Sequence, residues 1–196
     1  MVENKSFIRR EFGPVKKINN NNYLTSLLMK FKSHSEVAGT FENLSISILD
    51  TEKLLAFSVG DGEIFISKGM IRLLKSEGEF VFVISHEFGH VALGHHLNKT
   101  KGSRAEIEAD RFALSTISKL GYPPSSALSA LISTYGITEF LTNSDLYSNI
   151  HGDELIHPSL NTRLDSLREV FSTLDDVNNH TNDPTKRQFY SFKMSL

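Results

Sequence analysis

Two histidines and a glutamate lie within residues 83–93 in the pattern H-E-x-x-H. His86 and His90 are four residues apart, so on a helix both imidazoles leave the same face, one turn apart. Two nitrogen ligands at this spacing suit a tetrahedral Zn²⁺ ion. Glu87 is offset by one residue, so it can take the proton of a water on the metal without being a ligand itself.

The residues around this motif predict a helix in the middle of a domain. One apolar run precedes the motif at 80–84 and another follows it at 91–93, so the helix is apolar nearly all round. The same pattern arises by chance on a core helix whose histidines are satisfied by neighbouring groups, and the motif alone does not separate the two interpretations. A third ligand elsewhere in the chain would favour the metal site.

A third zinc ligand is predicted in the next helical segment. If the two helices are antiparallel neighbours, residues equidistant from the turn between them lie at the same height. Asn98, at the start of a polar stretch where this turn is expected, is halfway between His90 and Glu106. Glu106 on the second helix should therefore lie at the same height along the helix axes as His90 on the first. The alternative is a helix cap, because Ser103 and Glu106 have the spacing of a capping box.

Asp110 follows Glu106 by one turn on the same face of the predicted helix. From there its carboxylate can accept a hydrogen bond from a ligand imidazole and fix the tautomer of that ring. The alternative is a surface partner of a basic residue one turn away, but the height and spacing favour the metal site. Glu108 is expected to be solvated, and His95 and His96 are expected to face away from the histidine pair.

Composition limits the class of protein. The chain has 196 residues, of which 39% are hydrophobic and 22% are charged, as in a soluble globular domain. A net charge of -2 gives no argument for nucleic acid. There is no cysteine, so zinc would be held by histidine and carboxylate. The longest apolar run, 80–84, is too short to span a bilayer, and no signal peptide precedes it, so a cytoplasmic location is predicted.

The pattern of apolar and polar residues along the rest of the sequence predicts one α+β domain over 23–175. An extended lead-in at 1–22 precedes this domain, and a loosely ordered polar tail at 176–196 follows it. Alternation predicts a strand at 43–49 with one solvated face, and a Gly-Asp-Gly turn predicts a hairpin of 54–59 and 63–67. Residues 136–158 are expected to be irregular and, from their position just before His157, to form a lid over the cleft, which deletion of 143–152 would test. Helices are expected at 23–33, 69–74, 77–96, 99–120, 125–134 and 159–171.

Further motifs surround H-E-x-x-H in a fixed order. They are Ala56-Phe57, Gly62-Glu63-Ile64-Phe65-Ile66, Glu106-x-Glu108-Ala109-Asp110, Gly121-Tyr122-Pro123-Pro124, and His157-Pro158 with Arg163. Together they resemble the gluzincin peptidases of the HtpX and CAAX prenyl-endopeptidase type over about residues 50–171. The resemblance implies a zincin-like fold, in which the edge strand of a small β-sheet packs on the active-site helix and the second half is mostly helical.

The resemblance also implies a zinc metalloendopeptidase. One Zn²⁺ per chain would be bound by His86, His90 and Glu106. Glu87 would be the general base that activates the zinc-bound water for peptide hydrolysis, and Asp110 would support a ligand histidine.

The implied substrate is a polypeptide in extended conformation that pairs with the edge strand by β-addition. The strand residues that would hold it are Ala56, Phe57, Ser58 and Val59. His157 and Arg163 would stabilise the oxyanion, or His157 would occlude the metal as a fourth ligand while Arg163 supports the site. A second interpretation makes His157 a loop residue packed near the cleft.

Two departures from the family bear on the substrate. Leu55 stands where the family often has Asn, which weakens a substrate contact but not the metal chemistry. The transmembrane segments of the membrane members are missing, so a prenylated membrane substrate is not expected.

Two alternatives to this peptidase remain. One is a cytoplasmic regulatory metalloprotease similar to the ImmA/IrrE group, which has a similar motif helix but is less well matched by the Gly-Tyr-Pro-Pro and His-Pro motifs. The other is a zinc-stabilised, non-catalytic module that holds peptide on the sheet edge. The presence of Glu87 favours an enzyme over that module.

Overall fold

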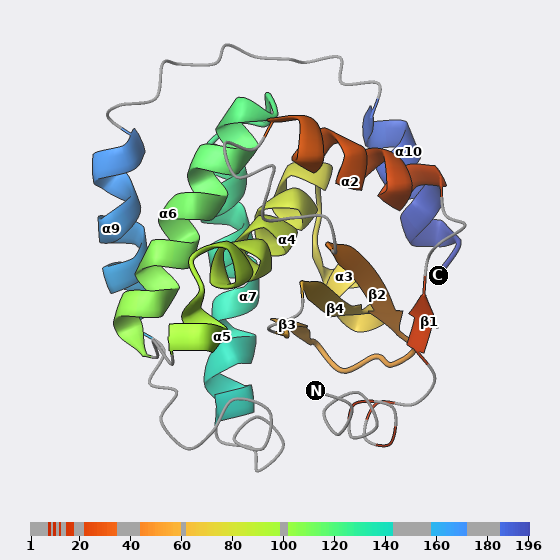
Figure 1. The fold of residues 1–196 in the computed structure, drawn as a ribbon, viewed down its shortest axis with the longest axis horizontal. Helices are drawn as coiled ribbons and strands as arrows, with labels where there is room; N and C mark the ends of the chain where they lie inside the picture. The colour runs from red at the N-terminus through yellow and green to blue at the C-terminus, as the bar shows by residue number, and fades with distance from the viewer. Residues whose placement is uncertain are drawn as a thin grey trace.

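The computed structural model describes residues 8, 10, 12, 15–17, 22–34, 44–59, 62–98, 102–142, 158–171 and 185–196. The described part of the chain is α+β, as predicted, with a small mixed sheet and a mostly helical second half. Helix α4 (Glu77–Ala92) runs through the middle of the molecule, and the sheet lies on one side of it (Figure 1). On the other side lie α6 (Ser103–Lys119), α7 (Ser125–Thr142) and α9 (Leu160–Phe171).

The sheet has the strand order β1-β2-β4-β3. Strand β2 (Ser45–Leu49) pairs antiparallel with β1 (Val15–Lys17) and parallel with β4 (Glu63–Ser67). The predicted hairpin is confirmed, since β3 (Ala56–Ser58) pairs antiparallel with β4. Within the described residues β3 is an edge strand, and it packs against α4.

The predicted solvated face of β2 is wrong, because the strand is buried on both faces. Ser47 is only 1% exposed, and its hydroxyl donates a hydrogen bond of 2.7 Å to Glu63 Oε1. This partner allows a serine to lie inside the sheet, since a buried hydroxyl without a hydrogen bond would be costly. The alternation of Ile and Ser therefore reports two packed faces here, not one packed and one wet face.

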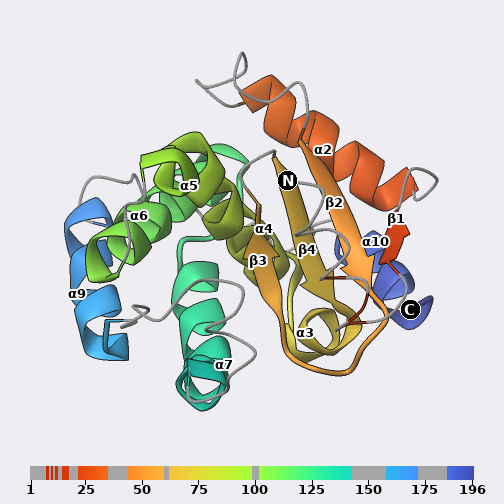
Figure 2. The same ribbon diagram turned by 60° about the horizontal axis from the view of Figure 1, so that its bottom comes forward.

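Each face of the sheet has its own apolar cluster. The face toward α4 and α2 (Asn22–His34) contributes Ile46, Ile48, Ile64 and Ile66 to the main core. On the opposite face a smaller cluster consists of Ile8, Phe12, Leu49, Leu55, Phe57 and Phe65. Apolar side chains therefore cover both faces of the sheet, and α2 and α4 lie along one of them (Figure 2).

Helix α4 begins at a well-formed N-cap and is buried for most of its length. The Ser76 hydroxyl accepts a hydrogen bond from the backbone N–H of Glu79, which satisfies a free amide of the first turn. All residues from Glu77 to Gly89 are buried. Nevertheless, no helix in the described ranges is both long and apolar enough to cross a membrane.

The predicted helix at 77–96 is interrupted near its end. Helix α4 stops at Ala92, and Gly94 has a φ of 67°, a conformation that favours glycine. A separate short helix, α5 (His95–Asn98), then starts in a new direction. This break changes where the two histidines of α5 point.

The second half follows the prediction, with one extension. Helices α6, α7 and α9 are present, but α7 continues to Thr142, so the expectation of irregular structure is wrong for 136–142. Of the segment 136–158 predicted as a lid, residues 143–157 lie outside the described residues.

Both ends of the chain contribute more than predicted. Val15–Lys17 pairs with β2 as a strand of the sheet, whereas only an extended lead-in was predicted for 1–22. In the tail, α10 (Thr185–Met194) buries Phe189 and Phe192 against α2 and the start of α4, next to α3 (Lys68–Leu73). The expectation of a loosely ordered tail is therefore wrong for 185–194, since two aromatic side chains supply the apolar area that this helix needs to dock.

Candidate metal centre

Helices α4 and α6 are in tight contact beside the predicted metal site. A Cβ atom built on Gly89 would lie 3.1 Å from the Cα of Ala109 and 3.2 Å from Cδ1 of Phe112. The Phe88 and Phe112 rings pack edge to face beside this contact, with centroids 5.6 Å apart. Glycine at position 89 therefore lets α6 come close enough to bring its carboxylates to the histidines of α4.

Three potential metal ligands converge between these helices. The Nε2 atoms of His86 and His90 are 3.1 Å apart, and they lie 3.4 and 3.3 Å from the two carboxylate oxygens of Glu106. All ligand atoms of this group lie within 4.8 Å of one another. In a tetrahedral site with bonds of about 2.0–2.1 Å, ligand atoms lie about 3.3 Å apart. The residues present therefore fit a Zn²⁺ ion.

The charge around His86 favours a cation at this point. Burial lowers the pKa of His86, but hydrogen bonds to Asp110 and Glu106 and the charges of both carboxylates outweigh burial and raise it to about 10. The same two carboxylates would stabilise a divalent ion in place of the proton.

Asp110 holds the far side of the His86 ring. Its Oδ1 is 2.9 Å from His86 Nδ1, and Arg163 donates from Nε to Oδ2 at 2.7 Å and from Nη2 to Oδ1 at 2.6 Å. Burial raises the pKa of Asp110, but the Arg163 guanidinium and the hydrogen bonds lower it below its ordinary value. Asp110 is therefore ionised and accepts the His86 Nδ1–H, which leaves Nε2 facing Glu106.

These contacts exclude the alternative interpretations of the two α6 carboxylates. The N-cap of α6 is Gly102, and no side chain hydrogen-bonds to the cap, so Ser103 and Glu106 do not form a capping box. Asp110 is completely buried, so it is not a surface partner of a basic residue.

Glu87 lies next to His86 on α4 and is 9% exposed. Among the described residues, no side chain or backbone group is hydrogen-bonded to its carboxylate. A carboxylate that is near the ligand group and uncommitted to a neighbour is available for proton transfer.

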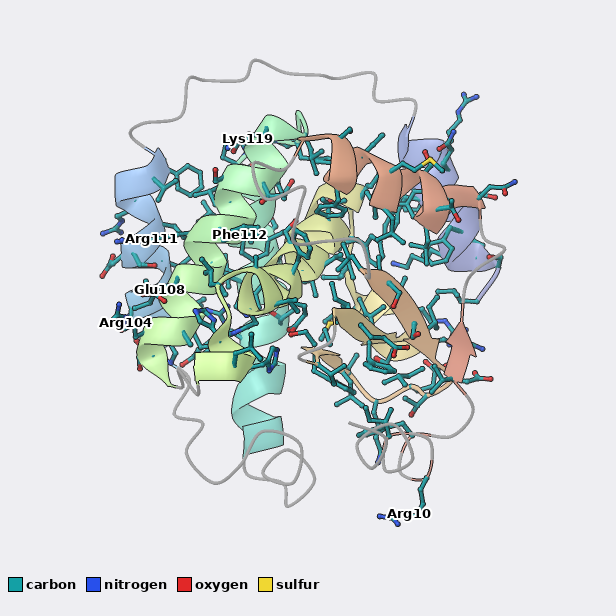
Figure 3. All side chains as sticks on the ribbon, viewed as in Figure 1. Arg10, Arg104, Glu108, Arg111, Phe112 and Lys119 are labelled. Atoms are coloured by element: carbon teal, nitrogen blue, oxygen red, sulfur yellow. The ribbon has the colours of Figure 1, made fainter. Side chains whose placement is uncertain are left out.

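The expected orientation of His95 is wrong, whereas Glu108 is partly exposed to solvent, as expected, with 37% of its side chain accessible. The His95 ring is turned toward the site, with its Nδ1 atom 3.0 Å from His90 Nδ1 and its Nε2 atom 3.1 Å from Glu108 Oε2. Glu108 also accepts a hydrogen bond of 2.8 Å from Arg104 Nε, and both side chains lie along α6 (Figure 3). The break at Gly94 places His95 beside His90, and Gly94 itself was the sequence signal for this.

The edge strand and α5 meet next to the ligand group. The Ser58 hydroxyl is 2.9 Å from His96 Nε2, and the His96 ring centroid is 6.3 Å from that of His90. Phe57 is directed to the opposite face of the sheet, where it stacks on Phe65 at 5.2 Å. The predicted substrate strand 56–59 thus runs beside the metal centre, whereas His157 lies outside the described residues.

Comparison with protein families gives two matches. Residues 20–105 match Peptidase family M48, and residues 80–182, more than half of the chain, match Peptidase U49. The two ranges overlap over the segment that carries H-E-x-x-H. The M48 match confirms the resemblance to HtpX-type peptidases, and neither match favours the ImmA/IrrE-like alternative. No curated protein matches the sequence.

Proposed function

Because the chain belongs to the Peptidase U49 family and residues 20–105 match Peptidase family M48, we propose that it is a zinc-dependent metalloendopeptidase of the gluzincin type. Both families are peptidases, so hydrolysis of polypeptide is the activity that the matches support. The observation that carries the zinc assignment is the group of His86, His90 and Glu106, whose ligand atoms lie within 4.8 Å of one another.

The proposed ligands are His86 Nε2, His90 Nε2 and the Glu106 carboxylate. Zn²⁺ bound there would polarise the scissile carbonyl and lower the pKa of a water in the open fourth position. Three protein ligands with one open position are typical of catalytic sites and not of structural zinc sites, which are closed by four protein ligands.

Glu87 is the proposed general base. Its carboxylate takes a proton from the attacking water and passes it to the amine that leaves when the peptide bond breaks. Its burial beside His86 keeps it close to the reacting atoms, and the absence of a hydrogen-bond partner among the described residues leaves it free to move the proton.

Arg163 is a proposed positioning residue. Two of its guanidinium nitrogens are hydrogen-bonded to Asp110, which in turn holds His86, and the third, Nη1, is 3.9 Å from Glu106 Oε2. This pairing favours support of the site over a direct role on the oxyanion. The proposal for an oxyanion or occluding role of His157 stands on the resemblance alone.

The proposed substrate is an extended polypeptide on the outer edge of β3. Leu55 and Val59 direct backbone groups to β4, with hydrogen bonds from Ser67 N–H to Leu55 O of 2.9 Å and from Val59 N–H to Glu63 O of 3.0 Å. In an antiparallel pair the direction alternates, so the N–H and C=O of Ala56 and Ser58 face away from β4. These groups can pair with a substrate backbone.

The first test is zinc content together with proteolysis. Elemental analysis of protein purified without chelators should give about one zinc per chain, largely lost in Glu106→Ala, because the third ligand is removed. Glu87→Gln should keep its zinc but cleave unfolded casein at least about 100-fold more slowly, because it lacks the general base.

Absence of zinc from the wild-type protein would contradict the zinc assignment. Zinc binding without cleavage of any unfolded substrate, in wild type as in Glu87→Gln, would point instead to a peptide-binding module.

A further inference from the structure

The two ligand histidines are supported in different ways on their outer sides. His86 Nδ1 contacts the carboxylate of Asp110 directly at 2.9 Å. His90 Nδ1 contacts a second imidazole, that of His95, at 3.0 Å, and His95 Nε2 contacts Glu108 Oε2 at 3.1 Å. The His90 and His95 rings meet nearly edge to face, with an interplanar angle of 69° and centroids 5.1 Å apart.

The direction of the hydrogen bonds in the series His90–His95–Glu108 follows from the residues at its two ends, His90 and Glu108. At one end, His90 can bind a metal through Nε2 only if its proton is on Nδ1, so this N–H must donate to His95 Nδ1. At the other end, the Glu108 carboxylate can only accept, so His95 Nε2 must carry a proton. Both requirements are met by the same neutral tautomer of His95.

We propose that His95 is a positioning residue of the metal centre, which accepts the Nδ1–H of His90, and that Glu108 fixes the His95 tautomer that allows it to do so. This inference rests on the proposed zinc site. Each proposed ligand histidine is then supported by a carboxylate at its Nδ1 atom. Asp110 supports His86 directly, and Glu108 supports His90 through the His95 imidazole.

Burial and charge support this role. His95 is 5% exposed, although it lies on a short helix whose next two residues, His96 and Leu97, are exposed. Beyond His95, the Glu108 carboxylate also accepts a hydrogen bond of 2.8 Å from Arg104 Nε, so its position beside His95 is held from two sides.

Position 95 can be varied to separate hydrogen bonding from packing. His95→Phe keeps a ring in the site but removes the acceptor. His95→Asn is smaller, yet its side-chain carbonyl can occupy the place of Nδ1 and accept from His90. Glu108→Gln keeps an acceptor for His95 Nε2–H but removes the charge. His96→Gln is the control for a neighbouring imidazole without a hydrogen bond to a ligand: His96 Nε2 lies 2.9 Å from the Ser58 hydroxyl, and its ring meets that of His90 only at a centroid distance of 6.3 Å.

The experiment measures the zinc dissociation constant of each full-length variant by competition with a chromophoric chelator at pH 7, together with the melting temperature of the metal-free protein. Removing an outer hydrogen-bond partner of a metal ligand typically costs about 10–100-fold in metal affinity. We expect a loss of this size in His95→Phe, a smaller loss in Glu108→Gln, substantial recovery in His95→Asn, and no change in His96→Gln.

Two results would overturn the proposal. One is His95→Phe that binds zinc as tightly as wild type. The other is His95→Asn that is as weak as His95→Phe, because a purely packing role would be served no better by the smaller side chain. If the wild-type protein itself bound no zinc, the proposed function would be overturned, and the role of His95 with it. The wild-type measurement alone distinguishes this outcome from a failure of the His95 proposal, in which the wild type binds zinc.

Discussion

His86 lies between two carboxylates, with Asp110 on Nδ1 and Glu106 on Nε2. In the metal-free protein this arrangement raises the pKa of His86 to about 10, so the ring carries two protons at neutral pH. The Nδ1 proton is held by Asp110 and stays in place when a metal binds. The proton on Nε2 lies where the proposed zinc ion would bind, so a metal ion would compete with this proton for one nitrogen.

This competition predicts a pH-dependent zinc affinity. Below pH 10 each bound ion must displace a proton from His86, so the apparent dissociation constant should fall about tenfold for each unit that the pH rises. The dependence should flatten as the pH approaches 10, where the ring is already deprotonated. Competition with a chelator of known affinity at pH 6, 7 and 8 measures the slope.

Asp110→Asn is the control for this measurement, because it keeps a side-chain oxygen that can accept from His86 Nδ1 but removes a negative charge that raises the His86 pKa. The slope should then flatten at a lower pH than in the wild type. An affinity that does not change between pH 6 and 8 in the wild type would show that His86 is not the proton-bearing ligand.

The proximity of His86, His90, Glu106 and Asp110 could be predicted from sequence because all four depend on regular helices. The periodicity of a helix fixes which residues share a face, and an antiparallel neighbour returns at a calculable height. His95 was placed incorrectly because its direction depends on one positive φ at Gly94, which ends the helical register. Local backbone conformation of this kind is not encoded in hydrophobic periodicity.

At the scale of secondary structure, the distance between α4 and α6 controls the geometry of the site. The ligand histidines lie on one helix, and Glu106 and Asp110 lie on the other. The helices touch at Gly89, where a methyl group would meet the backbone of Ala109 at 3.1–3.3 Å. Any side chain at this point has to move α6 or strain the contact.

Gly89→Ala should therefore weaken both the fold and the metal site. Alanine is the better helix former by about 1 kcal/mol, but overpacking a core typically costs about 1–3 kcal/mol, so we expect a net loss of stability. Displacement of α6 should also raise the zinc dissociation constant. Thermal unfolding of the metal-free protein and chelator competition test the two effects. A higher melting temperature with unchanged zinc affinity would show that the interface accommodates the methyl group.

The free edge of β3 gives a second prediction at this scale. Ala56→Pro removes an N–H that points away from β4, so it leaves the strand pairing of the hairpin intact. Loss of one backbone hydrogen bond to substrate, worth about 1 kcal/mol, should raise KM for an unfolded peptide substrate about fivefold, with a smaller effect on kcat.

Ala56→Val is the matched control, because it changes the side chain but keeps the N–H. Its KM should stay within about twofold of the wild type, because the backbone N–H that would pair with substrate is unchanged. Ala56 is partly buried against the core, so the melting temperature of Ala56→Val is measured alongside. Equal KM values for Ala56→Pro and wild type would remove this edge from the proposed substrate site.

In the molecule as a whole, α4 is the element that both halves share. The sheet, α2 and α10 pack on one side of it, and α6, α7 and α9 lie on the other (Figures 1 and 2). A helix covered on all sides has to be apolar nearly all round, as the sequence indicates for 80–84 and 91–93. The proposed ligand histidines are among the few polar side chains on this helix, together with Glu77, Glu79, Ser85 and Glu87, while its apolar side chains build the core.

This arrangement explains why the ends of the chain were harder to predict than the centre. The strand Val15–Lys17 and helix α10 become ordered by long-range contacts, with β2 and with α2 and α4 respectively. Their composition alone is polar and suggests little reason to pack. The signal in the tail was the pair Phe189 and Phe192, which share a helix face at a spacing of three residues.

The contribution of α10 can be tested at Phe189. Its ring is fully buried, with centroids 5.4 Å from Phe80 at the start of α4 and 6.2 Å from Tyr23 on α2. Truncation of a buried phenylalanine typically costs about 3–5 kcal/mol, and Phe189→Ala should lower the free energy of unfolding by this amount in urea. Met194→Ala, at a position 86% exposed on the same helix, should change it by no more than about 0.5 kcal/mol.

Zinc binding distinguishes a general effect on the fold from an effect on the site. Phe80 is more than one turn from His86 along α4, and α10 makes no described contact with Glu106 or Asp110. Folded Phe189→Ala, measured well below its melting temperature, should therefore bind zinc with wild-type affinity. If its unfolding free energy matched that of the wild type, α10 would not be part of the cooperative fold, and the tail would behave as its polar composition predicted.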